Sequence, residues 1–204
     1  MEGKLLKVEA ISKKFHNIFR FTRRIAEVKL KDGSRHELIR HVLETGPAVS
    51  ILPYFYDRNK KDWFVVLIRQ YRPAVDAMCL EAPGGLTKEG KNLKLEMARE
   101  LLEESGIIVK PSYIKVISTQ HMANSFCDQV VHVGIVDLKI NDLRMWRHSL
   151  NKNYGMISER EFTELVILPL RRVLNSPSLV TYTLTKYQIH DLARRLKFKE
   201  KKSK

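Results

Sequence analysis

Residues 84–107 read GGLTKEGKNLKLEMARELLEESGI, and no other stretch of the chain carries as many structural signals. Two glycines open it, where the backbone can bend and approach other groups closely. Apolar residues then recur at helical spacing, at Leu93, Met97, Leu101 and Leu102. Gly106 follows them, and glycine commonly ends a helix. The pattern predicts a bend at the glycines and a helix over residues 92–105.

Three glutamates share one face of this predicted helix. At 3.6 residues per turn, Glu100, Glu103 and Glu104 lie within about a third of the helix circumference. Like charges this close repel one another unless a cation neutralises them, and carboxylate oxygens suit Mg²⁺ or Mn²⁺. A merely solvated acidic face would carry the same pattern, so the residues alone leave both interpretations open.

Strand signals surround this stretch on both sides. Before it, β-rich segments lie in KLLKVEAIS, FRFTRRIAEVKL, RHELIRHVL, PAVSILPYFY and WFVVLIRQY, with a turn at Asp32-Gly33-Ser34. After it, we expect strands at 112–119, 129–138 and 162–168, an amphipathic stretch near 140–150 and a final helix at about 179–197. Strands before, between and after helices indicate an α+β or three-layer α/β/α arrangement. The first 40 or so residues form either a separate small sheet or extra strands of the main one.

Composition limits the class of protein. The chain has 204 residues with 44% hydrophobic content, which suits one domain, or one domain with an N-terminal extension. No apolar run approaches the roughly 20 residues of a membrane helix, and MEGKLLKVEA lacks a signal-peptide apolar block. Only Cys79 and Cys127 are present, so we expect buried thiols and no disulfide framework or zinc site. A soluble, cytoplasmic protein is predicted.

The net charge of +14 favours anionic partners, either phosphorylated small molecules, nucleic acid or an acidic surface. Much of the excess lies in the last dozen residues, ARRLKFKEKKSK. This end is either a solvated helix end with a frayed tail or an arm that binds nucleic acid.

The glycine pair and the acidic helix together resemble the Nudix box, a glycine with a glutamate six residues on and then REUxEExGU, where U is aliphatic. Residues 99–107, RELLEESGI, match the second half at every specified position. The resemblance implies a Nudix fold, an α/β/α sandwich with a mixed β-sheet, with extra antiparallel N-terminal strands. Residues 1–43 would be a β-rich extension and possible dimerisation arm, 44–198 the Nudix hydrolase domain, and 199–204 a basic tail.

The resemblance also implies roles within the box. Glu100 and Glu104 would bind Mg²⁺ or Mn²⁺, with the main-chain carbonyl of Gly84 as a further ligand. Arg99 would pair with a box carboxylate and hold it in place. Glu103 would belong to the catalytic carboxylates.

Lys91 departs from the pattern, because it stands six residues after Gly85, where the box has glutamate. A lysine there puts a positive charge at the start of the helix, where the dipole favours an acid. We expect weakened or retuned activity, with Glu96, one turn before Glu100, in part compensating.

Outside the box, most of residues 35–170 resembles the ADP-ribose and nucleoside-diphosphate-sugar pyrophosphatases. The stretches LIRQYRPAV (67–75), LEAPGG (80–85) and EFTELVILPL (161–170) carry this likeness. It implies that Arg72 meets phosphate with Tyr71 nearby, and that Glu81 helps to bind substrate or metal. From the residues alone, these could equally be a charged strand end, a core tyrosine and an ordinary strand carboxylate.

A loop carboxylate near the last strand often completes such a site, and Glu161 fits this catalytic role, with Glu159 and Glu164 as alternatives. The substrate loop of the family falls at His121, Asn124 and Asp128, where His121 is either a general base or a structural residue. Gln129 stands where the branch often has an acid, which puts the usual sugar specificity in doubt.

The expected reaction is therefore metal-dependent hydrolysis of a nucleoside diphosphate linked to another moiety, ADP-ribose or a nucleotide sugar, by a homodimer. The products would be a nucleoside monophosphate and a sugar phosphate. Two alternatives remain. One is hydrolysis of RNA 5′ ends, caps or dinucleoside polyphosphates, and the other is a catalytically weak module that binds nucleotide or RNA.

Overall fold

The computed structural model describes residues 1–15, 18–140, 142–146, 149–150, 152–156, 158 and 160–198. The predicted basic tail at 199–204 lies outside them. The chain divides into two compact units. The first comprises Met1–Ala48, Leu86–Glu89 and Thr119–Val131, and the second comprises Val49–Gly85, Gly90–Ser118 and the chain from His132 onward.

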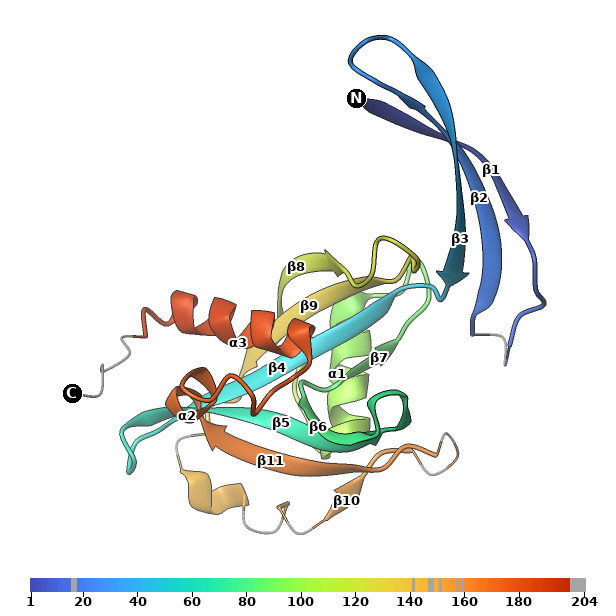
Figure 1. The fold of residues 1–204 in the computed structure, drawn as a ribbon. Coiled ribbons are helices and arrows are strands. Elements are labelled where there is room, and N and C mark those ends of the chain that lie inside the picture. The colour runs from blue at the N-terminus through green and yellow to red at the C-terminus, as the bar shows by residue number, and fades with distance from the viewer. Residues whose placement is uncertain are drawn as a thin grey trace. The chain divides into compact units, whose positions relative to one another are not determined.

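The first unit contains a separate three-stranded antiparallel sheet in the order β1-β2-β3 (Figure 1). Its strands are β1 (Glu2–Ala10), β2 (Arg20–Lys29) and β3 (Arg35–Glu44). The predicted turn joins β2 to β3, with Gly33 at a φ of 87° and the Leu30 amide donating to the Ser34 carbonyl at 2.9 Å. Of the two N-terminal arrangements left open by the sequence, the separate small sheet is the one observed.

The main sheet has eight strands, with the path β10-β11-β5-β4-β9-β8, β6 paired to β5 and β7 paired to β4. The bounds are β4 (Ala48–Asp57), β5 (Asp62–Arg72), β6 (Ala77–Glu81), β7 (Gly84–Leu86), β8 (Lys115–His121), β9 (Val130–Asp137), β10 (Asn153–Tyr154) and β11 (Thr163–Pro169). Strands β4 and β5 form the predicted hairpin, and β11 pairs antiparallel to β5 on its other side. The apolar residues of β4 and β5 thus lie at the centre of the sheet.

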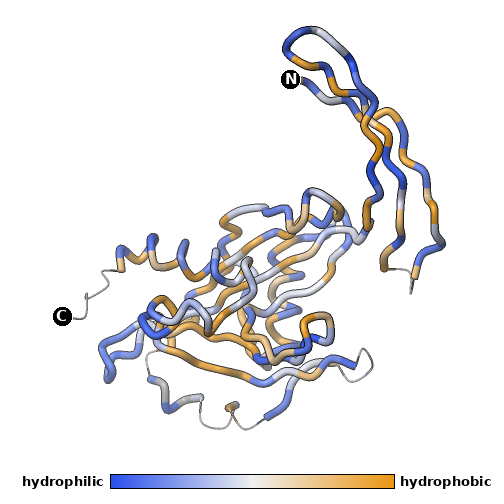
Figure 2. Tube along the Cα trace, in the orientation of Figure 1, coloured by the Kyte–Doolittle hydropathy of each residue, from blue (hydrophilic) through white to orange (hydrophobic). Residues whose placement is uncertain are grey.

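Helices cover both faces of this sheet. Side chains along a strand alternate between the two faces, so the apolar strands β4 and β5 present an apolar surface on each side. On one face α1 (Leu93–Ser105) packs Met97 and Leu101 against Ile51 and Val66. On the other, α2 (Leu170–Leu174) and α3 (Thr183–Arg195) form a second core with alternate residues of the same strands, Leu52, Val65 and Leu67. Figure 2 shows the apolar residues concentrated along these central strands. The predicted α/β/α sandwich with a mixed sheet is confirmed.

The structure differs from the expected elements in several places. Strands β6 and β7 and helix α2 were not predicted, and among the described residues near 140–150 the helical structure is a short 3₁₀ turn at Leu143–Trp146. Strand β8 begins at Lys115 because Pro111–Tyr113 forms another 3₁₀ turn. Cys79 is buried as expected, whereas Cys127 is only partly buried. In the described part of the chain, no helix has the length and apolar character needed to cross a membrane.

Candidate functional site

Helix α1 forms the framework of the site. The Asn92 side chain caps it by accepting hydrogen bonds from the Lys94 and Leu95 amides at 3.1 and 3.3 Å. Gly106, at a φ of 68°, ends it with a hydrogen bond from its amide to the Leu102 carbonyl. The predicted helix and its glycine terminator are confirmed.

The glycine pair lies directly against two of the helix glutamates. The Gly84 amide donates a hydrogen bond of 2.7 Å to Oε2 of Glu104, a side chain that is only 2% exposed. Gly85 approaches Glu100 so closely that a Cβ at this position would lie 2.6 Å from Glu100 Oε1. Two features 15 to 20 residues apart in sequence therefore meet in one place, and a side chain at position 85 would displace the Glu100 carboxylate.

Arg99 contacts three glutamates of the same helix. Its guanidinium donates to Glu100 Oε1 and, at 2.6 Å, to Glu103 Oε2. A weaker contact of 3.4 Å reaches Glu96. Arg99 therefore has the contacts that a positioning role requires, and Glu103 and Glu96 are turned toward it.

Burial makes the carboxylates of Glu100 and Glu104, the inner carboxylates of the site, hard to ionise. It raises the pKa of Glu104 to about 8, where the Gly84 amide opposes the shift and the charges of Glu100 and Glu161 add to it. Burial likewise raises the pKa of Glu100 to about 7, against the opposing charge of Arg99. Bringing a cation next to these groups would favour their ionised forms, which is the electrostatic requirement of a metal-binding pair.

The donor set fits a hard divalent cation only in part. Glu100, Glu104 and main-chain carbonyls near Gly84 offer the oxygen ligands that Mg²⁺ and Mn²⁺ take. Among the residues that the structure describes, however, no three His, Cys, Asp or Glu side chains form a ready-made metal cluster. A cation here would complete its coordination with main-chain oxygens, water or the phosphates of a substrate, as Mg²⁺ commonly does.

The segment that carries Glu161 is attached to the end of α1. The Gly155 amide donates to the Glu103 carbonyl at 2.9 Å, and Thr163 Oγ1 donates to the Glu104 carbonyl at 2.7 Å. The charge of Glu161 raises the pKa of both Glu100 and Glu104, so it lies within electrostatic range of that pair. Of the two alternatives, Glu164 is paired with Arg69 across β5 and β11, and Glu159 lies outside the described residues.

Arg72 and Glu81 form a bidentate ion pair at the ends of β5 and β6, with nitrogen–oxygen distances of 3.0 and 2.7 Å. Glu81 is 6% exposed, and Glu104 adds to the negative field on Arg72. The pair therefore lies near the inner carboxylates. Tyr71 points elsewhere, because its hydroxyl donates to Asp76 in the connection after β5.

Buried polar residues of α3 support the glycine turn, and the sequence analysis did not single them out. Thr185 Oγ1 accepts a hydrogen bond of 2.9 Å from the Ala82 amide, and Gln188 accepts one of 3.1 Å from Ser50 Oγ. The Ile51 amide donates to the Pro83 carbonyl at 2.8 Å. These bonds fix the chain immediately before Gly84. Thr185 and Gln188 are fully buried. They are polar residues on the buried face of an amphipathic helix, and this departure from the apolar pattern is the sequence signal that could have identified them.

The proposed substrate-loop residues belong to the first unit. Asp128 accepts hydrogen bonds from the Arg24 guanidinium and, at 3.0 Å, from the Thr45 amide. It therefore ties together segments of that unit. His121 and Asn124 are exposed or partly exposed there.

Lys91 lies before the helix cap, exposed, and makes no ion pair with the described residues. We expect Lys91→Glu to raise turnover roughly two- to fivefold, because an acid at a helix start is favoured by about 0.3–1 kcal/mol. Steady-state kinetics would measure this, with Lys91→Gln as the matched control that removes charge without adding an acid. Equal rates for all three proteins would show that position 91 has no influence on the site.

Comparison with known proteins gives a consistent set of relatives. The chain is 26% identical over 152 residues to an ADP-ribose pyrophosphatase of Bacillus subtilis, covering 74% of this chain and 71% of that protein. It is 35% identical over 131 residues to a mouse ADP-sugar pyrophosphatase, covering 64% of this chain and 56% of that one. A crystal structure of an ADP compounds hydrolase superposes with a TM-score of 0.66 at 18% identity, covering 97% and 95% of the two chains. No family model matches the sequence.

The residues 99–107, the sheet between two helical layers and these relatives make the chain similar to the Nudix pyrophosphohydrolases. The relatives named above are ADP-ribose and ADP-sugar pyrophosphatases, and the likeness is to that branch of the class.

Proposed function

We propose that this chain hydrolyses the diphosphate of a nucleoside diphosphate linked to a sugar, with ADP-ribose as the first candidate. Nucleoside monophosphate and sugar phosphate would be released. The observation that carries the proposal is the buried pair Glu100 and Glu104, held against the Gly84–Gly85 turn. The names of the relatives point to the same substrate class.

Each residue of the site has a role in this proposal. Glu100, Glu104 and the Gly84 carbonyl would hold Mg²⁺ or Mn²⁺, which when bound lowers the pKa of water and neutralises charge on phosphate oxygens. Arg99 fixes the orientation of Glu100 and Glu103. Arg72, released from or shared with Glu81, binds a phosphate of the substrate. Water attacks one phosphorus, the bond from that phosphorus to the bridging oxygen breaks, and Glu161 takes the proton of the water.

Glu161→Gln is expected to lower turnover by roughly 10²- to 10⁴-fold, because a positioned general base contributes that much. Substrate binding should stay close to that of the wild type, since glutamine keeps the shape of the side chain. Pre-steady-state and equilibrium binding measurements separate the two effects, with Glu164→Gln as the control on the neighbouring, Arg69-paired carboxylate. Wild-type turnover in Glu161→Gln would remove it from the mechanism.

The direct test of the proposed function is a substrate screen. ADP-ribose, UDP-sugars, dinucleoside polyphosphates and capped RNA would be incubated with Mg²⁺ or Mn²⁺, and Glu104→Gln would serve as the inactive control. Turnover of ADP-ribose or a nucleotide sugar by the wild type alone supports the proposal. Preferred release from capped RNA would favour the RNA-processing alternative.

A second candidate is a catalytically weak Nudix module that binds nucleotide. Lys91 in the box and the lack of a three-carboxylate cluster in the described part of the chain favour it. Nucleotide binding without turnover of any compound in the screen would support this candidate.

We also propose that the chain forms a homodimer through its three-stranded sheet. Strand β1 pairs with no further strand on its outer side in the described part of the chain, and Leu5, Leu6, Val8 and Phe21 are each about half exposed, which is unusual for large apolar residues in strands. Light scattering should give about twice the 23.8 kDa chain mass. The double substitution Leu6→Glu/Val8→Glu should return it to the monomer mass, and a monomeric wild type would contradict the proposal.

A further inference from the structure

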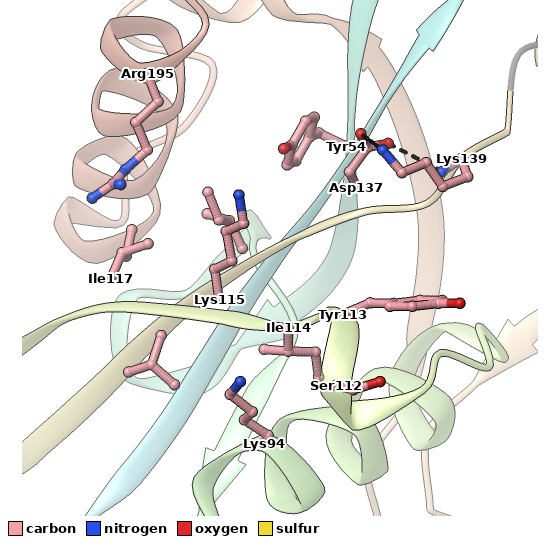
Figure 3. A pocket seen from close by; sticks show the side chains of 12 residues that line it. Tyr54, Lys94, Ser112, Tyr113, Ile114, Lys115, Ile117, Asp137, Lys139 and Arg195 are labelled. Atoms are coloured by element: carbon pink, nitrogen blue, oxygen red, sulfur yellow. Dashed lines mark hydrogen bonds and ion pairs between the residues drawn. The ribbon is translucent and has the colours of Figure 1, made fainter.

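A second cavity lies in the sandwich, apart from the carboxylates and glycines described above. It has a volume of about 1060 Å³ and is lined from β4, β8, β9, the start of α1 and the end of α3 (Figure 3). None of the residues assigned to the hydrolytic site contributes to its lining. A cavity of this size suits a small organic molecule more than a polymer.

The inner wall of the cavity is apolar. Ile135 and the partly exposed Ile117 belong to the core beneath α3, whereas Ile114 belongs to the core beneath α1. Tyr113 also lines the cavity and is 59% exposed. On the α3 side, an apolar part of a ligand would find its contact area at Ile117.

The rim of the cavity is cationic. It carries Lys94, Lys115, Lys139 and Arg195, against a single carboxylate, Asp137. Asp137 is occupied by Lys139, with an Nζ–Oδ2 distance of 2.7 Å, and Arg195 is paired with Asp191. Lys94 and Lys115 make no ion pair with any carboxylate in the described residues. The surplus of positive charge favours an anion.

Tyr54 adds a polar group inside the cavity. Its residue is only 9% exposed, and its hydroxyl makes no hydrogen bond within the described part of the protein. Figure 3 shows the hydroxyl pointing into the cavity, toward the side where Lys115 and Arg195 lie. Burial and the charge of Asp137 raise the pKa of Tyr54, and the charges of Lys139 and Arg195 oppose this. The hydroxyl is open to the cavity and can donate a hydrogen bond to an anion there.

We propose that this cavity binds an organic phosphate, with the phosphate group near Lys115 and Arg195 and the apolar part of the ligand against Ile117. Tyr54 donates its hydroxyl proton to a phosphate oxygen. The cations neutralise the phosphate directly, so binding needs no divalent metal. This property separates the cavity from the hydrolytic site, where carboxylates would repel a phosphate in the absence of metal.

The test uses AMP as the probe, with inorganic phosphate and adenosine in separate arms, and isothermal titration calorimetry on the full chain in EDTA. AMP should bind the wild type and Glu104→Gln equally well. Lys115→Glu should weaken binding at least about tenfold, since the reversal turns an attractive charge into a repulsive one. Tyr54→Phe should weaken it several-fold without disturbing the fold, because only one oxygen is removed.

Lys60→Glu is the matched control, since Lys60 is an exposed lysine of the same unit outside the cavity lining, and it should bind AMP as the wild type does. Loss of binding in Glu104→Gln but not in Lys115→Glu would overturn the proposal. So would a wild type that binds none of the three probes, or inorganic phosphate binding as tightly as AMP. If the protein bound single-stranded RNA in a Lys115-dependent way and did not bind AMP, the proposal would be wrong, and the ligand of the cavity would be a nucleic acid.

Discussion

Glu104→Gln is expected to abolish measurable hydrolysis while leaving the protein folded. In the proposed mechanism this carboxylate is a direct ligand of the catalytic cation, which supplies several kcal/mol of transition-state stabilisation, or roughly a thousandfold or more in rate. The substitution is otherwise mild. A glutamine oxygen can accept the same 2.7 Å hydrogen bond from the Gly84 amide, and the amide is nearly the same size as the carboxylate. Steady-state kinetics with Mg²⁺ or Mn²⁺ measures the loss.

The same variant should change how stability depends on pH. The pKa of Glu104 is about 8 in the folded protein, against an ordinary value of 4.5. Between these two values the folded form binds more protons than the unfolded form, so the metal-free protein loses stability as pH rises from about 4.5 to about 8. Glu104→Gln has no such proton to lose, and its stability should fall less over this range. The remaining decrease of stability with pH in this variant comes from Glu100, whose pKa is also raised.

Urea denaturation in EDTA at pH 5 and pH 8 would show this difference. Glu96→Gln is the matched control on the same helix, because Glu96 contacts only the outer side of Arg99. It should keep most of the activity and the pH dependence of the wild type. An active Glu104→Gln protein would contradict the proposed role of this residue in hydrolysis.

Gly85→Ala is expected to lower turnover by roughly 10²-fold, the typical cost of misplacing a catalytic group by about 1 Å. The added Cβ would lie 2.6 Å from Glu100 Oε1 and 2.7 Å from its Cδ. These atoms are the far end of a side chain, which can move aside. The fold should therefore tolerate the change, while Glu100 leaves the position that its pairing with Arg99 and its approach to the turn define. Metal titration and kinetics together would show weaker metal dependence and a lower rate.

Gly84→Ala is the matched comparison, since it adds the same methyl group one residue earlier. Its Cβ would lie 2.3 Å from the Val49 carbonyl oxygen and 2.8 Å from the Ser50 Cα, both backbone atoms of β4. Backbone cannot move aside cheaply, so this variant should lose stability by about 1–3 kcal/mol or more. Thermal unfolding distinguishes the two variants. Equal loss of stability in both would show that Gly85 is a packing residue with no separate influence on Glu100.

The sequence predicted the features that have strong local signals. Helix α1 was predictable because Asn92, the apolar spacing and Gly106 mark its start, its buried face and its end. The likeness to a known box predicted the Gly84 carbonyl close to Glu100 and Glu104, but it did not predict the hydrogen bond from the Gly84 amide to Glu104 or the contact between Gly85 and Glu100. The three residues of β7 show no periodicity, and their pairing with β4 depends on the close approach that Gly84 allows. Sequence reasoning could not find it.

Contacts between segments far apart in the sequence also could not be predicted. The Thr185 hydroxyl accepts a hydrogen bond from the Ala82 amide, 103 residues away in the sequence, and neither residue type predicts this contact. The cavity near Tyr54 is formed by segments far apart in the sequence, and its lysines look like ordinary surface charge there. The likeness to the family predicted Tyr71 near the substrate beside Arg72, and in the structure its hydroxyl donates to Asp76, while the Arg72 side chain, on the opposite face of the strand, pairs with Glu81.

The Gly155 amide and the Thr163 side-chain hydroxyl each donate to a main-chain carbonyl in the last turn of α1. In the proposed mechanism these two bonds hold both ends of the segment that carries Glu161 against the helix that carries Glu100 and Glu104. The approach of the proposed general base to the proposed metal ligands would then depend on the hydroxyl at position 163 as well as on main-chain geometry.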